Sequence, residues 1–449
     1  MFLPLILLLA SPFAFSHSGT DENPNRTLIR ISDSPEVKKY LRSHEYDVAG
    51  IDWRKGELEV LATPEEIAKL KEQNFNVVYE LSQTLLRNPD PEYLNPTKVE
   101  EALKRFQATY PDLTQLQSIG KSLEGRDIWA IKISSNPLVS KPAVLFNSMH
   151  HAREIMTPEV GIDIIDYLLT RYASDSQVQT WLNSTEVWVI PMFNVDGNNR
   201  MWMKDSMWRK NTRNGHGVDL NRNYPGTWNT CNGSSGMTFS QTYRGPSAGS
   251  EPETQVMMNF VKNIRPVFNI SYHSFSELVL YPYGCKPGKA QQVVESIGKE
   301  MGRLLNYKAG TPWELLYNAD GGDIDWMFQE MQVIPFVIEL NSSSQGGFHP
   351  DYKEWRDVTV EKNRVGWQLL LKRMQGPAIV GSVKTKNVVV EVRATSGDLV
   401  TEYRVNPDGS YFIILDEGQY NLKFKTSNSV IEQKSVNLAQ GNLTLKHLF

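Results

Sequence analysis

The stretch Ala143-Val144-Leu145-Phe146-Asn147-Ser148-Met149-His150-His151-Ala152-Arg153-Glu154-Ile155-Met156-Thr157-Pro158 determines how the centre of this chain folds. Its apolar start predicts a buried β-strand, and Thr157-Pro158 predicts the cap and first residue of a helix. His151 and Glu154 therefore lie in a strand-to-helix loop. An imidazole nitrogen and a carboxylate so placed can hold one face of a zinc ion, leaving room for a third ligand and a water. A short pair of this kind is weak evidence alone, so other segments must support it.

The composition is that of an ordinary globular protein with several domains. The 449 residues are 40% apolar and 22% charged, and the net charge is -4; this length allows about three domains. No basic run carries interleaved aromatic residues, so nucleic-acid binding is not expected. Cys231 and Cys285 are the two cysteines. In an exported protein they could form a disulfide or stay as two buried thiols, and their spacing does not decide between these states.

The first residues have the pattern of an export signal. Met1 to Ala10 is almost entirely apolar, Ser11-Pro12 interrupts the run, and Ala14-Phe15-Ser16 offers small residues for cleavage. This predicts a secretory signal peptide at residues 1–16, although the segment contains no Lys or Arg. The run is too short to span a membrane, and no later stretch approaches its length without charge. We therefore expect a secreted protein, extracellular or periplasmic, without a membrane span.

Residues 17–90 predict a small α+β domain. Strands are expected at 27–31, 48–52, 57–62 and 75–81, and helices at 35–44 and after Thr63, which forms a capping-box pattern with Glu66. The order β-α-β-β-α-β is typical of a ferredoxin-like domain. The polar, proline-bearing stretch at 87–91 then predicts a protease-accessible linker.

The remaining chain predicts an α/β domain followed by a β domain. In residues 91–375, apolar strands at 129–133, 143–147, 187–193, 268–272 and 333–340 alternate with helices at 158–172, 251–262, 289–306 and 351–373. This alternation predicts a sheet with helices on both faces. Residues 376–449 contain short strands separated by turns such as 407–410 and 416–419, which predicts a small β-sandwich.

Three other segments carry residues that could complete a metal site. His273 ends an apolar strand, where α/β sheets present functional groups, although a lone histidine there could simply be buried and hydrogen-bonded. Glu339 lies in the apolar strand Ile334–Leu340, and buried carboxylates are usually paired or catalytic. Arginines cluster between Trp208 and Tyr224. A guanidinium suits a carboxylate or an oxyanion, but a solvated basic loop would look the same.

Together, these segments resemble the zinc metallocarboxypeptidases of the carboxypeptidase A/B family, and within it most resemble bacterial carboxypeptidase T. The resemblance covers roughly Tyr93 to Arg373. It rests on segments that occur in the family's order: Ile119–Arg126, His151–Glu154, Asn194–Gly197, Trp208–Lys210, Val218–Asn223, Gln241–Gly245, Tyr272–Ser276, Tyr281–Gly284, Tyr317–Gly322 and Phe336–Leu340. Gln241 departs from the pattern, because the family often has an acid there. The resemblance implies a mixed central sheet, one zinc ion, and removal of the C-terminal residue from peptides and proteins.

The resemblance also implies the residues of the metal centre. His151, Glu154 and His273 match the zinc ligands, and Asp219 matches the acid that orients a zinc-bound histidine. Glu339 matches the general base, which takes a proton from zinc-bound water and passes it to the leaving amine.

Further residues match the family's substrate contacts. Arg209, in the Trp-Arg-Lys segment, matches the oxyanion arginine, whereas Arg213 is interpreted as an ordinary loop residue and His150 as structural. The other implied contacts are Asn221 and Arg222 for the terminal carboxylate, Tyr317 as the mobile tyrosine that closes over it, and Arg153 on the substrate path.

The implied pocket for the C-terminal side chain is apolar. Its lining residues are Leu280, Gly284, Ala319, Ile324 and Val337. Ile324 stands where enzymes specific for basic residues have aspartate, so apolar or aromatic residues should be accepted. Asp323 is unusual beside such a pocket and predicts some activity on Lys or Arg.

The flanking regions resemble those of known relatives. Residues 17–90 have the element order of the family's propeptides, which implies a zymogen whose prodomain acts as an intramolecular inhibitor and is removed near Arg87. The tail resembles a transthyretin-type sandwich, whose role stays open. Two alternatives are a cell-wall peptidase that cuts muropeptide stems and an inactive binding protein on the same scaffold. Asn221, Arg222 and Tyr317 argue against the first, and the complete ligand set with Glu339 argues against the second.

Overall fold

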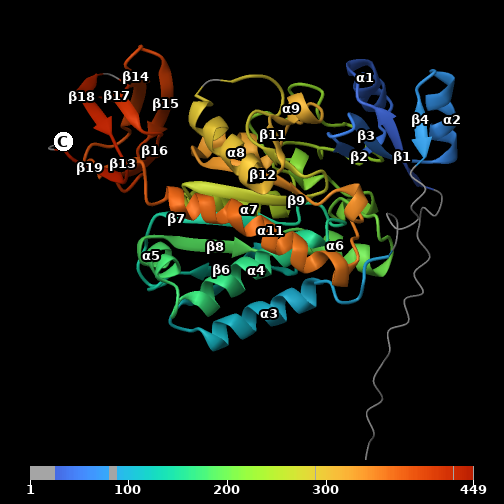
Figure 1. Ribbon diagram of the computed structural model, residues 1–449, viewed down its shortest axis with the longest axis horizontal. Helices are drawn as coiled ribbons and strands as arrows, with labels where there is room; N and C mark the ends of the chain where they lie inside the picture. Colours follow the sequence, from blue (N-terminus) through green and yellow to red (C-terminus); the bar gives the residue numbers. More distant parts are fainter. Residues whose placement is uncertain (1–25, 80–87, 289, 428, 448–449) are drawn as a thin grey trace, which may run out of the picture.

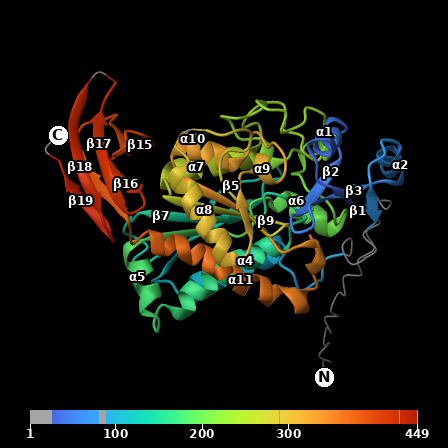
Figure 2. The same ribbon diagram turned by 45° about the horizontal axis from the view of Figure 1, so that its top comes forward.

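The computed structural model describes residues 26–79, 88–288, 290–427 and 429–447. The predicted signal peptide and the predicted cleavage point near Arg87 lie outside these residues. An α/β body forms the centre, and the N-terminal sheet and the C-terminal sheets lie at its two opposite ends (Figures 1 and 2).

The N-terminal unit is a four-stranded antiparallel sheet with two helices. Its elements are β1 (Thr27–Ser32), α1 (Pro35–Ser43), β2 (Asp47–Asp52), β3 (Glu57–Ala62), α2 (Pro64–Glu72) and β4 (Val77–Tyr79). The strand order is β2-β3-β1-β4, which is the ferredoxin-like arrangement that the element order predicts. Thr63 and Glu66 form the expected capping box at the start of α2.

The central sheet has eight strands in the order β11-β10-β12-β9-β7-β8-β6-β5. The sheet is mixed. Strands β12, β9, β7 and β8 run parallel to one another, whereas β6 pairs antiparallel with β8 on one side and with β5 on the other. The strands are β5 (Thr114–Lys121), β6 (Asp127–Ile133), β7 (Ala143–Ser148), β8 (Glu186–Ile190), β9 (Phe268–Ser274), β10 (Leu278–Leu280), β11 (Lys308–Gly310) and β12 (Ile334–Leu340).

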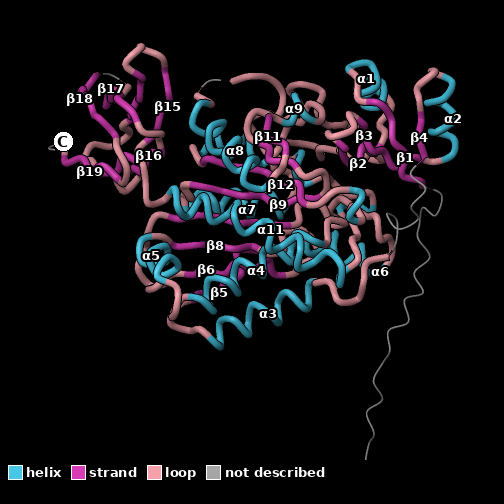
Figure 3. Tube along the Cα trace, in the orientation of Figure 1, coloured by secondary structure: helices cyan, strands magenta, loops and turns pink. Residues whose placement is uncertain are grey.

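Helices cover both faces of this sheet (Figure 3). Phe146 of β7 pairs with Val189 of β8, so Phe146 and Trp188 point to opposite faces. Phe146 packs against Trp367 of α11 (Tyr352–Arg373), while Trp188 packs against Phe260 of α7 (Pro252–Ile264). The helices are α3 (Pro96–Thr109), α4 (Met156–Arg171), α5 (Ser176–Ser184), α6 (Val195–Met203), α7 (Pro252–Ile264), α8 (Gln292–Leu305), α9 (Pro312–Leu315), α10 (Asp323–Met331) and α11 (Tyr352–Arg373), with short 3-10 turns η2 (Arg213–Gly215), η3 (Leu220–Arg222) and η4 (Ser343–Gln345).

Several predicted element ends differ from the structure, and two of them have an identifiable cause. Helix α4 begins at Met156, and Thr157 does not cap it: the Thr157 hydroxyl donates instead to the Glu154 carbonyl at 2.8 Å. Strand β8 ends at Ile190 rather than at Phe193. Pro191 follows, and a proline has no N–H with which to continue a ladder.

The C-terminal unit consists of two small sheets. One has the order β16-β13-β19 and the other β15-β14-β17-β18. Its strands are β13 (Ala378–Ser382), β14 (Val389–Ala394), β15 (Leu399–Arg404), β16 (Ser410–Ile414), β17 (Gly418–Lys425), β18 (Val430–Leu438) and β19 (Asn442–Lys446). Arg373, at the end of α11, donates to the Leu415 carbonyl at 2.9 Å and so ties this unit to the α/β body.

The two cysteines are bonded to each other, Cys231 to Cys285, across 54 residues. This pair joins the loop that follows η3 to the loop that follows β10. Among the described residues, no helix has the length and apolar character that a membrane crossing requires.

The aromatic packing of α11 on the sheet gives a test of the core. Trp367 is fully buried and makes edge-to-face ring contacts with Phe146, Tyr167 and Trp181. We expect Trp367→Ala to lower the free energy of unfolding by about 3–5 kcal/mol, because the lost contacts leave a cavity. Val358→Ala on the same helix, where the side chain is 50% exposed, should cost less than about 0.5 kcal/mol. Urea unfolding of both variants checks this, and similar losses would contradict it.

Candidate metal centre and substrate cavity

Three strand ends meet at one edge of the central sheet. Strands β12, β9 and β7 are neighbours and run parallel, so their carboxyl ends open onto the same crevice. Glu339 lies on β12 beside His273 of β9, and the loop after β7 carries His151 and Glu154. Asn147 of β7 donates to Asn269 of β9 at 2.8 Å, which fixes the two strands relative to each other.

His151, Glu154 and His273 converge into one buried cluster. Their nearest ligand atoms all lie within 4.8 Å of one another. His151 Nδ1 is 2.7 Å from Glu154 Oε1 and 3.1 Å from His273 Nδ1, and His273 Nδ1 is 3.1 Å from Glu154 Oε2. Two imidazoles and a carboxylate are a ligand set of catalytic zinc sites.

The outer nitrogens of both histidines have their own partners. His151 Nε2 is 3.1 Å from Asp219 Oδ1, and His273 Nε2 is 3.2 Å from the Ser271 hydroxyl. An acceptor at Nε2 keeps the proton there and leaves Nδ1 free as a metal ligand. Both Nδ1 atoms face Glu154, so the cluster fits a zinc ion.

The charges around the cluster favour a cation. Burial alone would raise the pKa of Glu154, but His151 and His273 lower it well below its usual range. Burial likewise opposes ionisation of Asp219, yet Arg209 and His151 hold its pKa well below normal. Both carboxylates therefore carry negative charge at neutral pH.

Arg209 lies between the metal cluster and the cavity. Its Nη2 donates to Asp219 Oδ2 at 3.0 Å, and its Nη1 lies 4.0 Å from Glu154 Oε1. The side chain is 8% exposed. Arg213, four residues on, pairs instead with Glu251 at 2.7 Å, in agreement with its interpretation as a loop residue.

Glu339 faces the same cavity as the metal cluster. Burial raises the pKa of Glu339 to about 8, with Glu154 adding to the effect and His273 opposing it. A carboxylate with a raised pKa beside a metal cluster is suited to accept and return a proton.

The cavity beside the cluster has a volume of about 70 Å³. The three residues of the metal cluster line it, together with Arg209, Asn221, Arg222, Tyr317 and Glu339. The five apolar positions that the resemblance implies, Leu280, Gly284, Ala319, Ile324 and Val337, all line it as well.

Asn221 and Arg222 are held by their own backbone surroundings. Asn221 Oδ1 accepts from the Asp323 N–H at 3.0 Å, and Arg222 Nη1 donates to the Asn221 carbonyl at 2.7 Å. The Arg222 guanidinium lies 6.0 Å from the centre of the Tyr317 ring. These groups present donors to the cavity.

Asp323 does not line this cavity. Its side chain is fully buried, and its Oδ2 lies 4.0 Å from His150 Nε2, behind the metal cluster. Asp325 lines the cavity instead and accepts from the Gly284 N–H at 3.0 Å. Positions two apart on a helix point about 200° apart, so only one of the two acids can face the pocket.

The N-terminal unit covers the cavity. Val48, Ala49 and Gly50 of β2 line it, and the Ile51 N–H donates to the Ser276 hydroxyl at 2.9 Å. A Cβ on Gly50 would lie 2.7 Å from that hydroxyl, so the approach needs a glycine.

Asp47 of the N-terminal unit binds Arg153. Arg153 is fully buried and binds both carboxylate oxygens of Asp47, at 2.8 and 2.9 Å. It does not line the small cavity, although it lies in the same loop as the metal ligands. The sequence alone gave no signal for Asp47, because the contact joins residues 106 positions apart.

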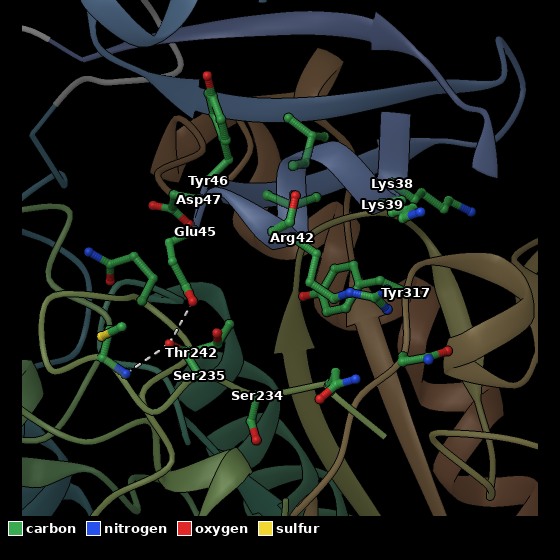
Figure 4. A pocket seen from close by; sticks show the side chains of 18 of the residues that line it. Lys38, Lys39, Arg42, Glu45, Tyr46, Asp47, Ser234, Ser235, Thr242 and Tyr317 are labelled. Carbon is green, nitrogen blue, oxygen red and sulfur yellow. Dashed lines mark hydrogen bonds between the residues drawn. The ribbon is translucent and has the colours of Figure 1, made fainter. Parts of the chain in front are cut away.

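A larger cavity of about 540 Å³ lies between α1 and the loop 232–242 (Figure 4). It shares Val48, Arg209 and Tyr317 with the small cavity. On its rim, the Ser235 hydroxyl donates to the Glu45 carboxylate at 2.8 Å. The N-terminal unit therefore leaves space beside the metal centre while closing over it.

Sequence reasoning also missed Ser271. Its hydroxyl donates to Asn147 Oδ1 at 3.1 Å and lies 3.2 Å from both His150 Nδ1 and His273 Nε2. Ser271 is two residues before His273 on β9, so it points to the same face. That spacing is the signal that could have identified it. His150 is fully buried and contacts the Tyr224 hydroxyl at 3.0 Å.

Comparison with known proteins places the chain in a family. A family model described as zinc carboxypeptidase matches residues 99–363. A zinc carboxypeptidase of Saccharothrix mutabilis subsp. capreolus is 31% identical over 375 residues, covering 74% of this chain and 85% of the relative. Carboxypeptidase A6 of Mus musculus is 28% identical over 306 residues, covering 64% of this chain and 66% of the relative.

Solved structures share the fold. A carboxypeptidase A from Helicoverpa armigera matches with a TM-score of 0.67 at 24% identity, covering 78% of this chain and 97% of that structure. Thrombin activatable fibrinolysis inhibitor (TAFI) matches with a TM-score of 0.66 at 22% identity, covering 78% of this chain and 98% of that structure. With the matched residues containing the whole metal cluster, this chain belongs to the zinc carboxypeptidase family, a family of metal-dependent hydrolases.

Proposed function

We propose that this protein is a secreted zinc carboxypeptidase that removes the C-terminal residue from peptides and proteins. The observation that carries the proposal is the shared cavity, in which the metal cluster, Glu339 and the Asn221-Arg222 pair face the same space. That arrangement suits a substrate whose scissile bond lies one residue from a free carboxylate. Secretion is supported by the apolar N-terminal segment.

In the proposed mechanism, proton transfer belongs to Glu339. His151, Glu154 and His273 would hold a zinc ion, which would supply Lewis acidity toward water and the scissile carbonyl. Glu339 takes a proton from the attacking water and passes it to the leaving amine. Arg209 donates hydrogen bonds to the developing oxyanion, while Asp219 keeps its guanidinium in place.

Recognition of the substrate's end uses fixed donors. Arg222 and Asn221 bind the terminal carboxylate, for which a guanidinium fork is well matched. Tyr317 lies on the cavity wall next to them and closes over the bound end. The free carboxylate requirement disfavours the cell-wall peptidase alternative, and the complete ligand set disfavours an inactive binding protein.

The side-chain pocket favours apolar or aromatic residues. Its walls are mainly aliphatic, with one carboxyl group, Asp325. Burial raises the pKa of Asp325 to about 7, and the hydrogen bond from the Gly284 N–H opposes this rise. Hydrolysis of substrates with a C-terminal Lys or Arg, which the presence of Asp323 predicts, stays a prediction. The closeness to bacterial carboxypeptidase T likewise stays a prediction.

The N-terminal unit acts as an inhibitory prodomain in this proposal. Its strand β2 lies across the cavity, and Asp47 binds the arginine on the substrate path. Removal of the unit near Arg87 would release both. The domain boundaries at residues 90 and 375 stay predictions.

Acid alone should not release this prodomain contact. Burial would raise the pKa of Asp47, but Arg153 lowers it to about 2. A carboxylate with a lowered pKa stabilises the folded state above its unfolded pKa and loses that contribution only as the pH falls toward the lowered value. The pair with Arg153 therefore persists through mildly acidic conditions.

Glu339→Gln tests the proton transfer. In the processed enzyme we expect kcat for a blocked dipeptide with C-terminal Phe to fall by about 10²- to 10⁴-fold, because the general base is lost. Zinc content by mass spectrometry should stay unchanged, and a chelator should abolish the wild-type activity. Near-normal turnover by the variant would sink the assignment of Glu339 as the base.

Arg209→Ala tests the oxyanion contact, with Arg213→Ala as its matched control. Loss of an oxyanion donor should lower kcat by about a hundredfold, whereas the control removes an arginine paired with Glu251 and should leave kcat nearly unchanged. Zinc content must be measured in both, since Arg209 also contacts Asp219. A loss below tenfold for Arg209→Ala, with zinc retained, would rule out this role.

Asp47→Asn tests the prodomain contact in the unprocessed chain. Without the carboxylate, Arg153 loses its buried partner, and the free energy that holds β2 over the cavity falls. We expect the unprocessed variant to hydrolyse the same dipeptide at least about tenfold faster than the unprocessed wild type. Asp33→Asn, which removes a prodomain acid paired with Lys38, is the control. Equal rates for Asp47→Asn and wild type would contradict the inhibitory contact.

A further inference from the structure

Asp323 is a buried carboxylate without a hydrogen-bonded partner. It is fully buried at the start of α10, and neither of its oxygens makes a hydrogen bond of normal geometry with the described residues. Removing a carboxylate from water without such partners is costly. The dipole of a helix N-terminus offsets only part of that cost. Burial raises the pKa of Asp323, and the neighbouring His273 is the largest effect that opposes this rise.

The surroundings of Asp323 lead directly to the metal cluster. Its Oδ2 lies 4.0 Å from His150 Nε2. His150 Nδ1 is 3.2 Å from the Ser271 hydroxyl, which is itself 3.2 Å from His273 Nε2. His150 and His273 are stacked, with ring centres 5.5 Å apart. Asp323 thus lies behind the imidazole of a metal ligand, on the side away from the cavity.

A similar arrangement exists on the other histidine ligand. Asp219 accepts from His151 Nε2 directly, and its carboxylate is likewise fully buried. A negative charge behind a metal-bound imidazole increases the basicity of that ligand and orients its ring. Asp219 also binds Arg209, whereas no cation bonds to Asp323 among the described side chains. A metal ion bound by His273 would add positive charge on the other side of that imidazole.

We propose that Asp323 is a positioning residue for the metal centre rather than a specificity residue: its charge, acting across His150 and Ser271, stabilises His273 as a zinc ligand. The inference rests on the proposed zinc site but concerns metal affinity, not peptide hydrolysis. In the metal-loaded state, the positive charge of the metal would compensate the buried charge of Asp323. In the metal-free state the same charge is a net penalty.

The test measures zinc binding by the full chain carrying Asp323→Asn. Competition with a chelating indicator should show a zinc dissociation constant raised by about 10- to 100-fold, as expected when an outer partner of a ligand is lost. The thermal midpoint of the metal-free variant should not fall, because a neutral amide replaces an uncompensated charge. The rise in midpoint on adding zinc should be smaller than in wild type. A purely structural role would instead lower the metal-free midpoint.

Asp325→Asn is the matched control. It makes the same change two residues away, on a carboxylate that faces the substrate cavity, and should leave the zinc dissociation constant unchanged. If Asp323→Asn binds zinc as tightly as wild type, the proposal is wrong. An unchanged zinc affinity with an altered ratio of basic to apolar hydrolysis would return Asp323 to a substrate role.

A second variant covers a failure of Asp323→Asn to fold. Ser271→Ala removes the hydroxyl between His150 and His273 and should weaken zinc binding in the same direction; unchanged affinity would overturn the proposal. Absence of peptide hydrolysis by zinc-loaded wild-type enzyme would contradict the proposed function instead, and the zinc affinities would still decide the role of Asp323. If the wild type does not bind zinc, both proposals fall.

Discussion

The parallel alignment of β12, β9 and β7 is the constraint on which the site depends. Adjacent parallel strands end at one edge of the sheet, so side chains from distant parts of the chain are delivered to one place without any long loop having to fold around them. The hydrogen bond between Asn147 and Asn269 joins β7 to β9. Both strands are buried on both of their faces, which keeps their ends in register. The sheet therefore brings the ligands together, with His273 on β9 and with His151 and Glu154 on the short loop that follows β7.

Buried charged residues are concentrated at the edge of the sheet where β12, β9 and β7 end. Asp219, Glu154 and Asp323 bring three carboxylates into the interior behind or beside the cluster, and Arg209 supplies one fixed cation. Such a concentration is expensive in a folded chain without a bound cation, because each charge is removed from water. The metal-free site is thus electrostatically incomplete, and metal binding and folding stability are linked through it.

Much of the fold followed from the sequence, and most of the ligand set did as well. Continuous apolar runs identified β7 and β12, and alternating apolar residues identified β9. Strands β10 and β11 span three residues each and are too short to show a period. Strands β18 and β19 contain many polar residues, so their sequences show no clear apolar pattern. The convergence of His151 with His273 required the resemblance, since 122 positions separate them. Side-chain direction was beyond the sequence: Asp323 and Asp325 are near neighbours in the chain but face opposite sides of α10.

The glycine at position 50 has a wider meaning. Because a Cβ there would meet the Ser276 hydroxyl, the covering strand fits its partner domain only at backbone distance. In the proposed zymogen, a covering domain taken from a distant relative would not fit this body, so the two parts would have to change together during evolution.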